Sequence, residues 1–461
     1  RDGYRWLRTL DNYGMGGVLA DDMGLGKTVQ VLSYLLAMKQ SGQTESKGLL
    51  PSLIVCPASL VLNWAEECQK FTPELSCVVV DGDAAHRAEL AESWPAADLV
   101  VTSYDLLRRD EALYEGQEFY ACILDEAQAI KNHTTQKYKA VCKVRSRVRF
   151  ALTGTPVENR LGELWSVFSF LMPGYLPPYK SFCSRFEKPI VQEEDQTAVR
   201  RLNQLTGPFI LRRMKADVLK ELPPKTENVY RIELEEEQRK LYLAAVVDAR
   251  EKLRAAKPED KMAVFAVLMR LREICCDPRL IADNWEGGSA KLDACVELIT
   301  GAVEGGHRIL LFSQFTSMLE LLAKRLDAEG ISHFTLQGST PKPVRAELVR
   351  RFNGGEVSVF LISLRAGGTG LNLTAADIVI HYDPWWNVAA QNQATDRAYR
   401  IGQQNPVQVY KLIAQDTIEE KIVELQQAKQ SLADTVTGTA DGAILSMRPD
   451  ELLQLLEGSE G

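Results

Sequence analysis

Short apolar runs alternate with amphipathic segments in two separate parts of the chain. Within each part the apolar runs are nearly continuous, which is typical of parallel strands buried on both faces of a sheet. The intervening segments have helical spacing, so both parts predict an α/β fold. The predicted strands are 52–57, 77–80, 98–104, 120–126 and 148–154 in the first part, and 308–314, 332–338, 357–364, 377–383 and 407–413 in the second.

The strand pattern fades between residues 157 and 290. Helical spacing dominates there, for example in MAVFAVLMRLREICC, where it places Phe265, Leu268 and Leu271 near one face. We therefore predict an α/β protein with two parallel-sheet lobes and helical insertions between them. The predicted domains are 1–156 for the first lobe, 157–290 for the helical insertions and linker, 291–430 for the second lobe, and 431–461 for a helical C-terminal tail.

The stretch VLADDMGLGKTVQVL has the ending of a phosphate-binding loop. The usual pattern has a glycine five residues before Gly26, but Asp21 stands there. The stretch nevertheless follows a small apolar element and precedes a helical run, which is the context such a loop requires. Gly24 and Gly26 permit a tight turn whose N–H groups face phosphate, Lys27 would reach the β- and γ-phosphates, and Thr28 would bind magnesium. The alternative is a glycine turn that only caps a helix.

A second polar site follows the apolar run ACIL, which leads directly into Asp125 and Glu126. An aspartate at the end of a strand is where nucleotide hydrolases hold magnesium. Glu126 would then orient and deprotonate the attacking water. The alternative is a polar strand end without function, which the position after a buried strand disfavours.

A third site is the segment QNQATDRAYRIGQ, in which Arg397 and Arg400 are three residues apart. On the predicted helix they share a face. Two guanidinium groups on one face could clamp phosphate oxygens as charge develops in a transition state. A solvated basic helix face is the alternative interpretation.

Composition adds few constraints. The 461 residues are 45% hydrophobic and 25% charged, with a net charge of −8, and this length predicts two or three domains. The acidic balance does not exclude a nucleic-acid partner, because salt confines electrostatic fields to about 8 Å and basic clusters occur at 143–149 and 211–215. Nine scattered cysteines without a C-x-x-C pair predict neither a disulfide framework nor a zinc site.

No apolar run approaches the length of about 18 residues that spans a membrane, and the first residues do not resemble a signal segment. We therefore expect a protein without a membrane partner. Its expected location is the cytoplasm, in association with the nucleoid, if it is bacterial, or the nucleus if it is eukaryotic.

Taken together, the motifs resemble those of Swi/Snf-type ATPases in helicase superfamily two. DDMGLGKT, DEAQAIKN, LTGTPVEN, LISLRAGGTGLNL and QATDRAYRIGQ occur in the family's order, and FILRRMKADV lies between the lobes. The family's loop has an acidic residue at the position of Asp21, which identifies the loop as a phosphate loop in its superfamily-two form. The compact insertions resemble those of bacterial or archaeal members.

The resemblance implies two RecA-like lobes with ATP and Mg²⁺ in the cleft between them. The implied catalytic residues are Lys27, Asp125, Glu126, Arg397 and Arg400, with both arginines acting as fingers across the cleft. The implied ATP-binding residues are Asp22, Met23, Gly24, Leu25, Gly26, Lys27, Thr28, Gly370 and Gln393, and the metal would be held by Thr28 and Asp125. Thr153, Gly154 and Thr155 would couple hydrolysis to lobe movement, and double-stranded DNA would contact Ser59, Tyr104, Gln314, Ser339 and Thr369.

The expected function is that of a monomeric, DNA-stimulated ATPase core. It would move along double-stranded DNA and remodel protein–DNA complexes without separating the strands. A strand-separating helicase is disfavoured by the helical insertions, and a DNA-binding scaffold without turnover is disfavoured by the intact catalytic residues.

Three features depart from the family pattern. The glutamine motif that recognises adenine is not found, so we expect the chain to be part of a longer protein. Tyr399 replaces the usual histidine and Val388 replaces a common proline. Neither replacement falls on the expected chemistry.

Overall fold

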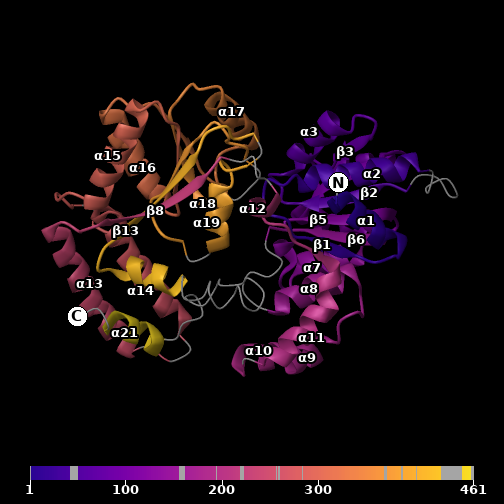
Figure 1. Cartoon of the computed structure of the whole chain (residues 1–461), viewed down its shortest axis with the longest axis horizontal. Coiled ribbons are helices and arrows are strands. Elements are labelled where there is room, and N and C mark those ends of the chain that lie inside the picture. Colours follow the sequence, from indigo (N-terminus) through magenta and orange to yellow (C-terminus); the bar gives the residue numbers. More distant parts are fainter. Residues whose placement is uncertain are drawn as a thin grey trace. The chain divides into compact units, whose positions relative to one another are not determined.

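The computed structural model describes two compact units, Arg1–Lys220 and Glu221–Gly461, each with its own sheet (Figure 1). The description covers all residues except 1, 42–49, 155–160, 194, 219–222, 256, 258–259, 283, 368–370, 386–387, 401, 427–448 and 458–461.

Unit 1 is built on a seven-stranded sheet with the order β3-β4-β2-β5-β6-β1-β7. All of its strand pairs are parallel. β2 and β4 are buried along their whole length, which explains why their sequences are apolar without alternation. The strands are β1 Gly17–Leu19, β2 Ser52–Cys56, β3 Cys77–Val79, β4 Leu99–Ser103, β5 Glu118–Asp125, β6 Arg145–Leu152 and β7 Ile210–Leu211.

The helices of unit 1 fall into two groups. The first group comprises α1 Asp2–Asn12, which precedes β1, and the helices that connect the strands, which are α2 Lys27–Gln40, α3 Val61–Phe71, α4 Ala84–Ser93, α5 Tyr104–Arg109, α6 Glu111–Glu115 and α7 Gln136–Lys143. The second group gathers on one side of the unit, where α8 contacts β6 (Figure 1). It comprises α8 Leu161–Leu171, α9 Tyr179–Phe182, α10 Lys188–Gln192 and α11 Gln196–Thr206, and the short α12 Lys215–Val218 follows β7.

Unit 2 is built on a six-stranded sheet with the order β10-β11-β9-β12-β13-β8, again with parallel pairs throughout. Alternate strand residues supply separate cores on the two faces, since Leu311 packs in one cluster and its neighbour Leu310 in another. The strands are β8 Lys225–Ile232, β9 Ile309–Ser313, β10 His333–Leu336, β11 Val359–Ser363, β12 Ile378–His381 and β13 Val407–Ala414.

The helices of unit 2 cover this sheet and form an additional cluster. α15 Ala290–Glu304 and α16 Thr316–Ala328 contribute to one face of the core, and α17 Lys342–Asn353, α18 Leu364–Gly367 and α19 Val388–Thr395 contribute to the other. α13 Glu236–Ala255, α14 Lys261–Cys276 and α21 Pro449–Glu457 pack together in a third cluster.

All ten predicted strands are present, as β2–β6 and β9–β13. The prediction missed β7 and β8, which lie in the region where only helices were expected. β8 is an edge strand that exposes most of its side chains, so it has no apolar run. The prediction for α14 was wrong for Phe265, which is 40% exposed while Leu268 and Leu271 are buried, because two three-residue steps rotate a helix position by about 120°.

No helix in the described part of the chain is long and apolar enough to cross a membrane. All nine cysteines are free thiols. The adjacent Cys275 and Cys276 are both fully buried in unit 2.

Candidate active site

The phosphate loop joins β1 to α2 at the carboxyl edge of the unit 1 sheet. Gly24 and Gly26 have φ angles of 89° and 72°, in the left-handed region that side chains rarely adopt. This turn lets α2 begin at Lys27 without a side-chain cap, so the N–H groups of its first turn can donate to an anion at the positive end of the helix dipole. Asp21, at the usual glycine position, is fully buried and forms an ion pair with Arg213.

The ammonium group of Lys27 lies against the start of the same loop. Its Nζ donates to the backbone oxygen of Asp21 at 2.6 Å and lies 3.4 Å from that of Asp22. Burial lowers the pKa of Lys27, whereas the carboxylates of Glu126, Asp125, Asp21 and Asp22 oppose this effect. The loop lysine and the carboxylates at the end of β5 therefore belong to one electrostatic cluster.

Asp125 is the last residue of β5, and two aromatic residues fix its position. The indole Nε1 of Trp64 donates to Asp125 Oδ2 at 2.8 Å, and the hydroxyl of Tyr104 donates to the backbone oxygen of Asp125 at 2.9 Å. Glu126 follows with a φ of 50°, and its N–H donates to Asp125 Oδ1 at 2.9 Å. A positive φ at a residue other than glycine stores strain, which clusters at functional sites.

The charges of this turn suit a divalent cation. Burial, followed by the neighbouring Glu126 carboxylate, raises the pKa of Asp125 to about 7, although Trp64 and Lys27 act in the opposite direction. The carboxylate of Asp125 and the hydroxyl of Thr28, in the first turn of α2, are the hard oxygen donors that Mg²⁺ prefers. Among the described residues there is no group of three His, Cys, Asp or Glu side chains that could hold a metal ion.

A chain of hydrogen bonds connects Thr153 to Glu126. Thr153 Oγ1 donates to Gln128 Oε1 at 3.1 Å, and Gln128 Nε2 donates to Glu126 Oε2 at 2.8 Å. The Thr153 N–H also donates to the backbone oxygen of Leu19, the last residue of β1, at 3.2 Å. The end of β6 is thus linked both to the phosphate-loop strand and to Glu126. Gly154 follows in a bend, and Thr155 lies outside the described residues.

In unit 2, the helix predicted to carry Arg397 and Arg400 ends before them, so that prediction was wrong. α19 ends at Thr395, and the next residues form tight turns in which the Arg397 N–H donates to Ala394 and the Arg397 carbonyl accepts from Leu373. Because the Arg397 carbonyl accepts from this distant segment, it does not take part in the i to i+4 hydrogen bonds that would continue the helix. Arg397 is 2% exposed, so it does not lie on a solvated basic face.

The turns that carry these arginines are organised by Gln403, which the sequence analysis did not single out. Its Nε2 donates to the backbone oxygens of Ala376 and Ala398 at 2.7 and 3.1 Å. Its Oε1 accepts from the next two N–H groups, at 2.9 Å each. Gln393 lies within α19, and Gly370 lies outside the described residues.

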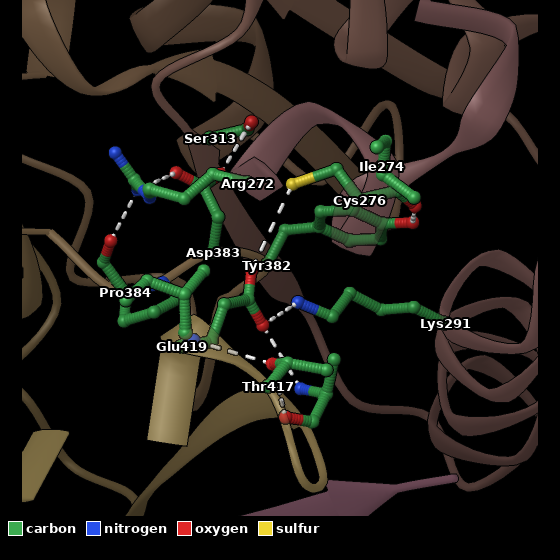
Figure 2. Close-up of polar contacts among 12 residues, drawn as sticks. Arg272, Ile274, Cys276, Lys291, Ser313, Tyr382, Asp383, Pro384, Thr417 and Glu419 are labelled. Atoms are coloured by element: carbon green, nitrogen blue, oxygen red, sulfur yellow. Dashed lines mark hydrogen bonds and ion pairs between the residues drawn. The ribbon is translucent and has the colours of Figure 1, made fainter. Parts of the chain in front are cut away.

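A buried polar network joins the ends of β9 and β12 in unit 2 (Figure 2). The carboxylate of Asp383 accepts from Ser313 Oγ at 2.6 Å and from the Gln314 N–H at 3.2 Å. Arg272 of α14 donates to the same carboxylate at 3.2 Å and also to the backbone oxygen of Pro384. Arg272 and Asp383 are fully buried, so α14 fixes the backbone of Gln314, one of the predicted DNA contacts.

A second buried ion pair lies beside this network (Figure 2). Lys291 of α15 donates to Glu419, and both side chains are fully buried. The same carboxylate accepts from the Ala414 N–H at 2.9 Å. Burial alone would lower the pKa of Lys291, but the facing carboxylate raises it. The contacts of Glu419 with Lys291 and with the Ala414 N–H fix the turn after β13.

The predicted DNA-contacting residues differ in exposure. Ser59 follows β2 and Gln314 follows β9, and both are half-buried, while Ser339 follows β10 and is exposed. Tyr104 is 3% exposed and its hydroxyl is bonded to Asp125, so its burial argues against a DNA contact. Thr369 lies outside the described residues.

Two α/β lobes with parallel sheets, a phosphate loop and an Asp-Glu pair at the end of a strand define the class of protein. The chain has the two-lobed, RecA-like organisation of helicase-type ATPases, as its motifs predicted.

The chain belongs to the SNF2-related family. The SNF2-related domain matches residues 1–280, and the helicase conserved C-terminal domain matches residues 290–402. These matches confirm the predicted Swi/Snf-type resemblance.

Several proteins are similar to this chain over nearly its whole length. A Mycoplasma genitalium protein named as an uncharacterised ATP-dependent helicase, MG018, is 40% identical over 99% of this chain and 44% of its own length. A Bacillus subtilis protein whose name describes an ATP-dependent helicase/translocase, YwqA, is 40% identical over 98% of this chain and 50% of its own length. The chain thus spans about half the length of these curated relatives. The solved Sulfolobus solfataricus SWI2/SNF2 ATPase core in complex with dsDNA is 35% identical, covering 99% of this chain and 96% of that one, with a TM-score of 0.48.

Proposed function

We propose that this chain is the motor core of a DNA-dependent ATPase that moves along double-stranded DNA and thereby remodels protein–DNA complexes. The observation that carries the proposal is the cluster of Lys27, Asp125 and Glu126 at the carboxyl edge of the unit 1 sheet. It occurs in a chain that has both the SNF2-related and the helicase C-terminal domain.

Unit 1 supplies the groups that bind ATP. The N–H groups of the phosphate loop and of the first turn of α2 would donate to the phosphate oxygens, and Lys27 would exchange its contact with the Asp21 carbonyl for the β- and γ-phosphates. Thr28 and Asp125 would hold Mg²⁺, which neutralises charge on the phosphates when it is bound.

Glu126 is the candidate general base. It would accept a proton from the attacking water, and the hydrogen bond from Gln128 orients its carboxylate for this role. Thr153 reaches the same carboxylate through Gln128. A movement at the end of β6 would therefore change the orientation of the base, which is a physical basis for the proposed coupling role of Thr153, Gly154 and Thr155.

Unit 2 would supply Arg397 and Arg400, which could neutralise the charge that develops on the phosphate in the transition state. This step requires the units to approach each other during turnover. DNA bound to both units would favour that state, and hydrolysis would be stimulated by a shift in population. Ser59, Gln314 and Ser339 are the proposed DNA contacts, since they follow the carboxyl ends of strands in both sheets.

Phosphate release with and without duplex DNA tests this proposal, with Lys27→Ala as the inactive control. We expect hydrolysis that duplex DNA stimulates in the unaltered chain and that is lost in the variant. Absence of ATP turnover in the unaltered chain would favour the scaffold alternative. Displacement of a third strand from a DNA triplex reports translocation, whereas release of one strand from a forked duplex would favour a strand-separating helicase.

A further inference from the structure

The segment Ile210–Lys215, near the end of unit 1, forms hydrogen bonds with the first half of the phosphate loop. β7 pairs with β1, and the pairing continues beyond the strands, since the Ala20 N–H donates to Leu211 at 2.7 Å and the Asp22 N–H donates to Arg213 at 3.0 Å. The Lys215 N–H donates in turn to the Asp22 carboxylate at 2.9 Å. The first half of the loop is therefore held by a segment almost two hundred residues away in sequence.

The side chain of Arg213 completes this attachment. Its Nε donates to Asp21 Oδ1 at 2.9 Å, and its terminal NH2 contacts Asp21 Oδ2 and donates to Gln30 Oε1 at 2.6 Å. Gln30 Nε2 donates to the Leu25 carbonyl at 3.1 Å and lies 3.3 Å from Asp21 Oδ2. Arg213 thus reaches the start of the loop directly and its end through Gln30.

We propose that Arg213 is a positioning residue for ATP, which sets the curvature of the phosphate loop through Asp21 and Gln30. The inference rests on the proposed function, because it concerns how that ATP site is held. Lys27 Nζ donates to the Asp21 backbone oxygen, so the lysine that would bind phosphate is placed by the residue that Arg213 fixes. The Asp21 carboxylate is fully buried, and removal of Arg213 would leave a buried charge without its cationic partner, which favours a displacement of the loop.

Gly3 of α1 offers an independent way to disturb the same contacts. A Cβ at this position would lie 1.7 Å from Gln30 Oε1 and 3.0 Å from the terminal nitrogen of Arg213. Gly3→Ala would therefore displace Gln30 without removing any charge. Away from this contact, alanine in a helix is favoured over glycine, so a loss of nucleotide affinity in this variant would not reflect a weaker helix.

The test compares Arg213→Ala with Arg212→Ala, because Arg212 is the exposed neighbour. We expect Arg213→Ala to raise the KM for ATP and the Kd for ADP by about ten-fold to a hundred-fold, since a displacement of about 1 Å at a site can cost on the order of 10²-fold. Arg212→Ala should leave both constants within about two-fold. Arg213→Lys should lie between them, because an ammonium group cannot make the forked contact to Asp21.

Asp21→Asn supplies a coupling test in the same assay. If Arg213 acts through Asp21, the double variant should lose less affinity than the product of the two single losses. Gly3→Ala should raise the Kd for ADP in a protein that remains folded by thermal denaturation. Equal ADP affinities for Arg213→Ala, Gly3→Ala and the unaltered chain would overturn the inference while leaving the proposed function intact. Failure of the unaltered chain to bind or hydrolyse ATP would instead overturn the proposed function.

Discussion

Replacing Trp64 by phenylalanine should weaken the proposed magnesium site without removing any of its ligands. Trp64 Nε1 donates to Asp125 Oδ2 at 2.8 Å, and the indole is 1% exposed. Phenylalanine keeps most of the apolar contact but has no donor. Tyr104 still holds the Asp125 backbone through its own hydrogen bond, so the turn itself should persist.

The expected size follows from the chemistry of this contact. A hydrogen bond to a charged group is worth about 1.5–3 kcal/mol, which corresponds to a change of roughly ten-fold to a hundred-fold in an equilibrium constant. The indole N–H favours the ionised carboxylate and lowers the pKa of Asp125. Its loss should move that pKa above its present value of about 7, so fewer molecules have the ionised ligand at neutral pH.

The assay is the Mg²⁺ concentration that gives half-maximal phosphate release, measured at pH 7 and pH 9. We expect the half-saturating concentration to rise about ten-fold or more at pH 7 and to rise less at pH 9, where a larger share of Asp125 is ionised in both proteins. Trp165→Phe is the matched control, because Trp165 Nε1 donates to a backbone oxygen, that of Pro177, also at 2.8 Å. Equal Mg²⁺ requirements for Trp64→Phe and Trp165→Phe would refute the assignment of Asp125 as the metal ligand.

Three further outcomes are expected. Glu126→Gln should bind ATP with little change but hydrolyse it at least about 10²-fold more slowly, since the proton acceptor is lost; loss of ATP binding as well would point to a structural role. Arg400→Ala should lower the DNA-stimulated rate of hydrolysis by roughly 10³-fold, with the Kd values for ATP and DNA unchanged. Arg400 is a better test than Arg397, because Arg397 is almost fully buried. A normal DNA-stimulated rate in this variant would contradict the finger role. For His381, burial lowers the pKa to about 3, below the unfolded value of about 6.5. The folded state therefore excludes a proton that the unfolded state binds, and stability should fall as the pH drops below about 6.5, by about 2 kcal/mol at pH 5. His381→Gln has no group that takes up this proton, so its stability should not show this loss. In urea unfolding, the free energy of unfolding of the unaltered chain minus that of the variant should be lower at pH 5 than at pH 7.5 by about 2 kcal/mol. The same difference at both pH values would contradict this prediction.

The parallel sheets could be predicted because the buried strands are nearly continuous apolar runs. β8 could not, since an edge strand such as KTENVYRI buries little and its polar residues resemble a loop. β7 is only two residues long, and it is defined by its pairing with β1 rather than by any local pattern.

In the candidate site, too, residues with a local sequence pattern could be predicted, whereas residues defined by contacts distant in sequence could not. Lys27 could be singled out from its phosphate-loop motif, and Asp125 and Glu126 from their place at the end of an apolar run, since strand ends in parallel sheets face the same edge. Their supporting residues could not, because Trp64 is 61 residues from Asp125 and Arg213 is 192 residues from Asp21 in sequence. For the pair of Asp21 and Arg213, the one signal in the sequence was the acidic residue at a glycine position of the loop, since a buried carboxylate requires a cationic partner.

The turn after β5 explains why motif matching alone did not give the roles of its residues. Tyr104 was assigned to DNA from its place in a motif, but its hydroxyl holds the carbonyl of Asp125. Glu126 has a strained backbone that no sequence pattern announces, and it needs support on both sides, from the Asp125 carboxylate at its N–H and from Gln128 at its side chain. Because Gln128 also accepts from Thr153, the orientation of the proposed base depends on where β6 ends. A change in that strand end can therefore alter catalysis without touching ATP, which is the property that a motor needs to link hydrolysis to movement.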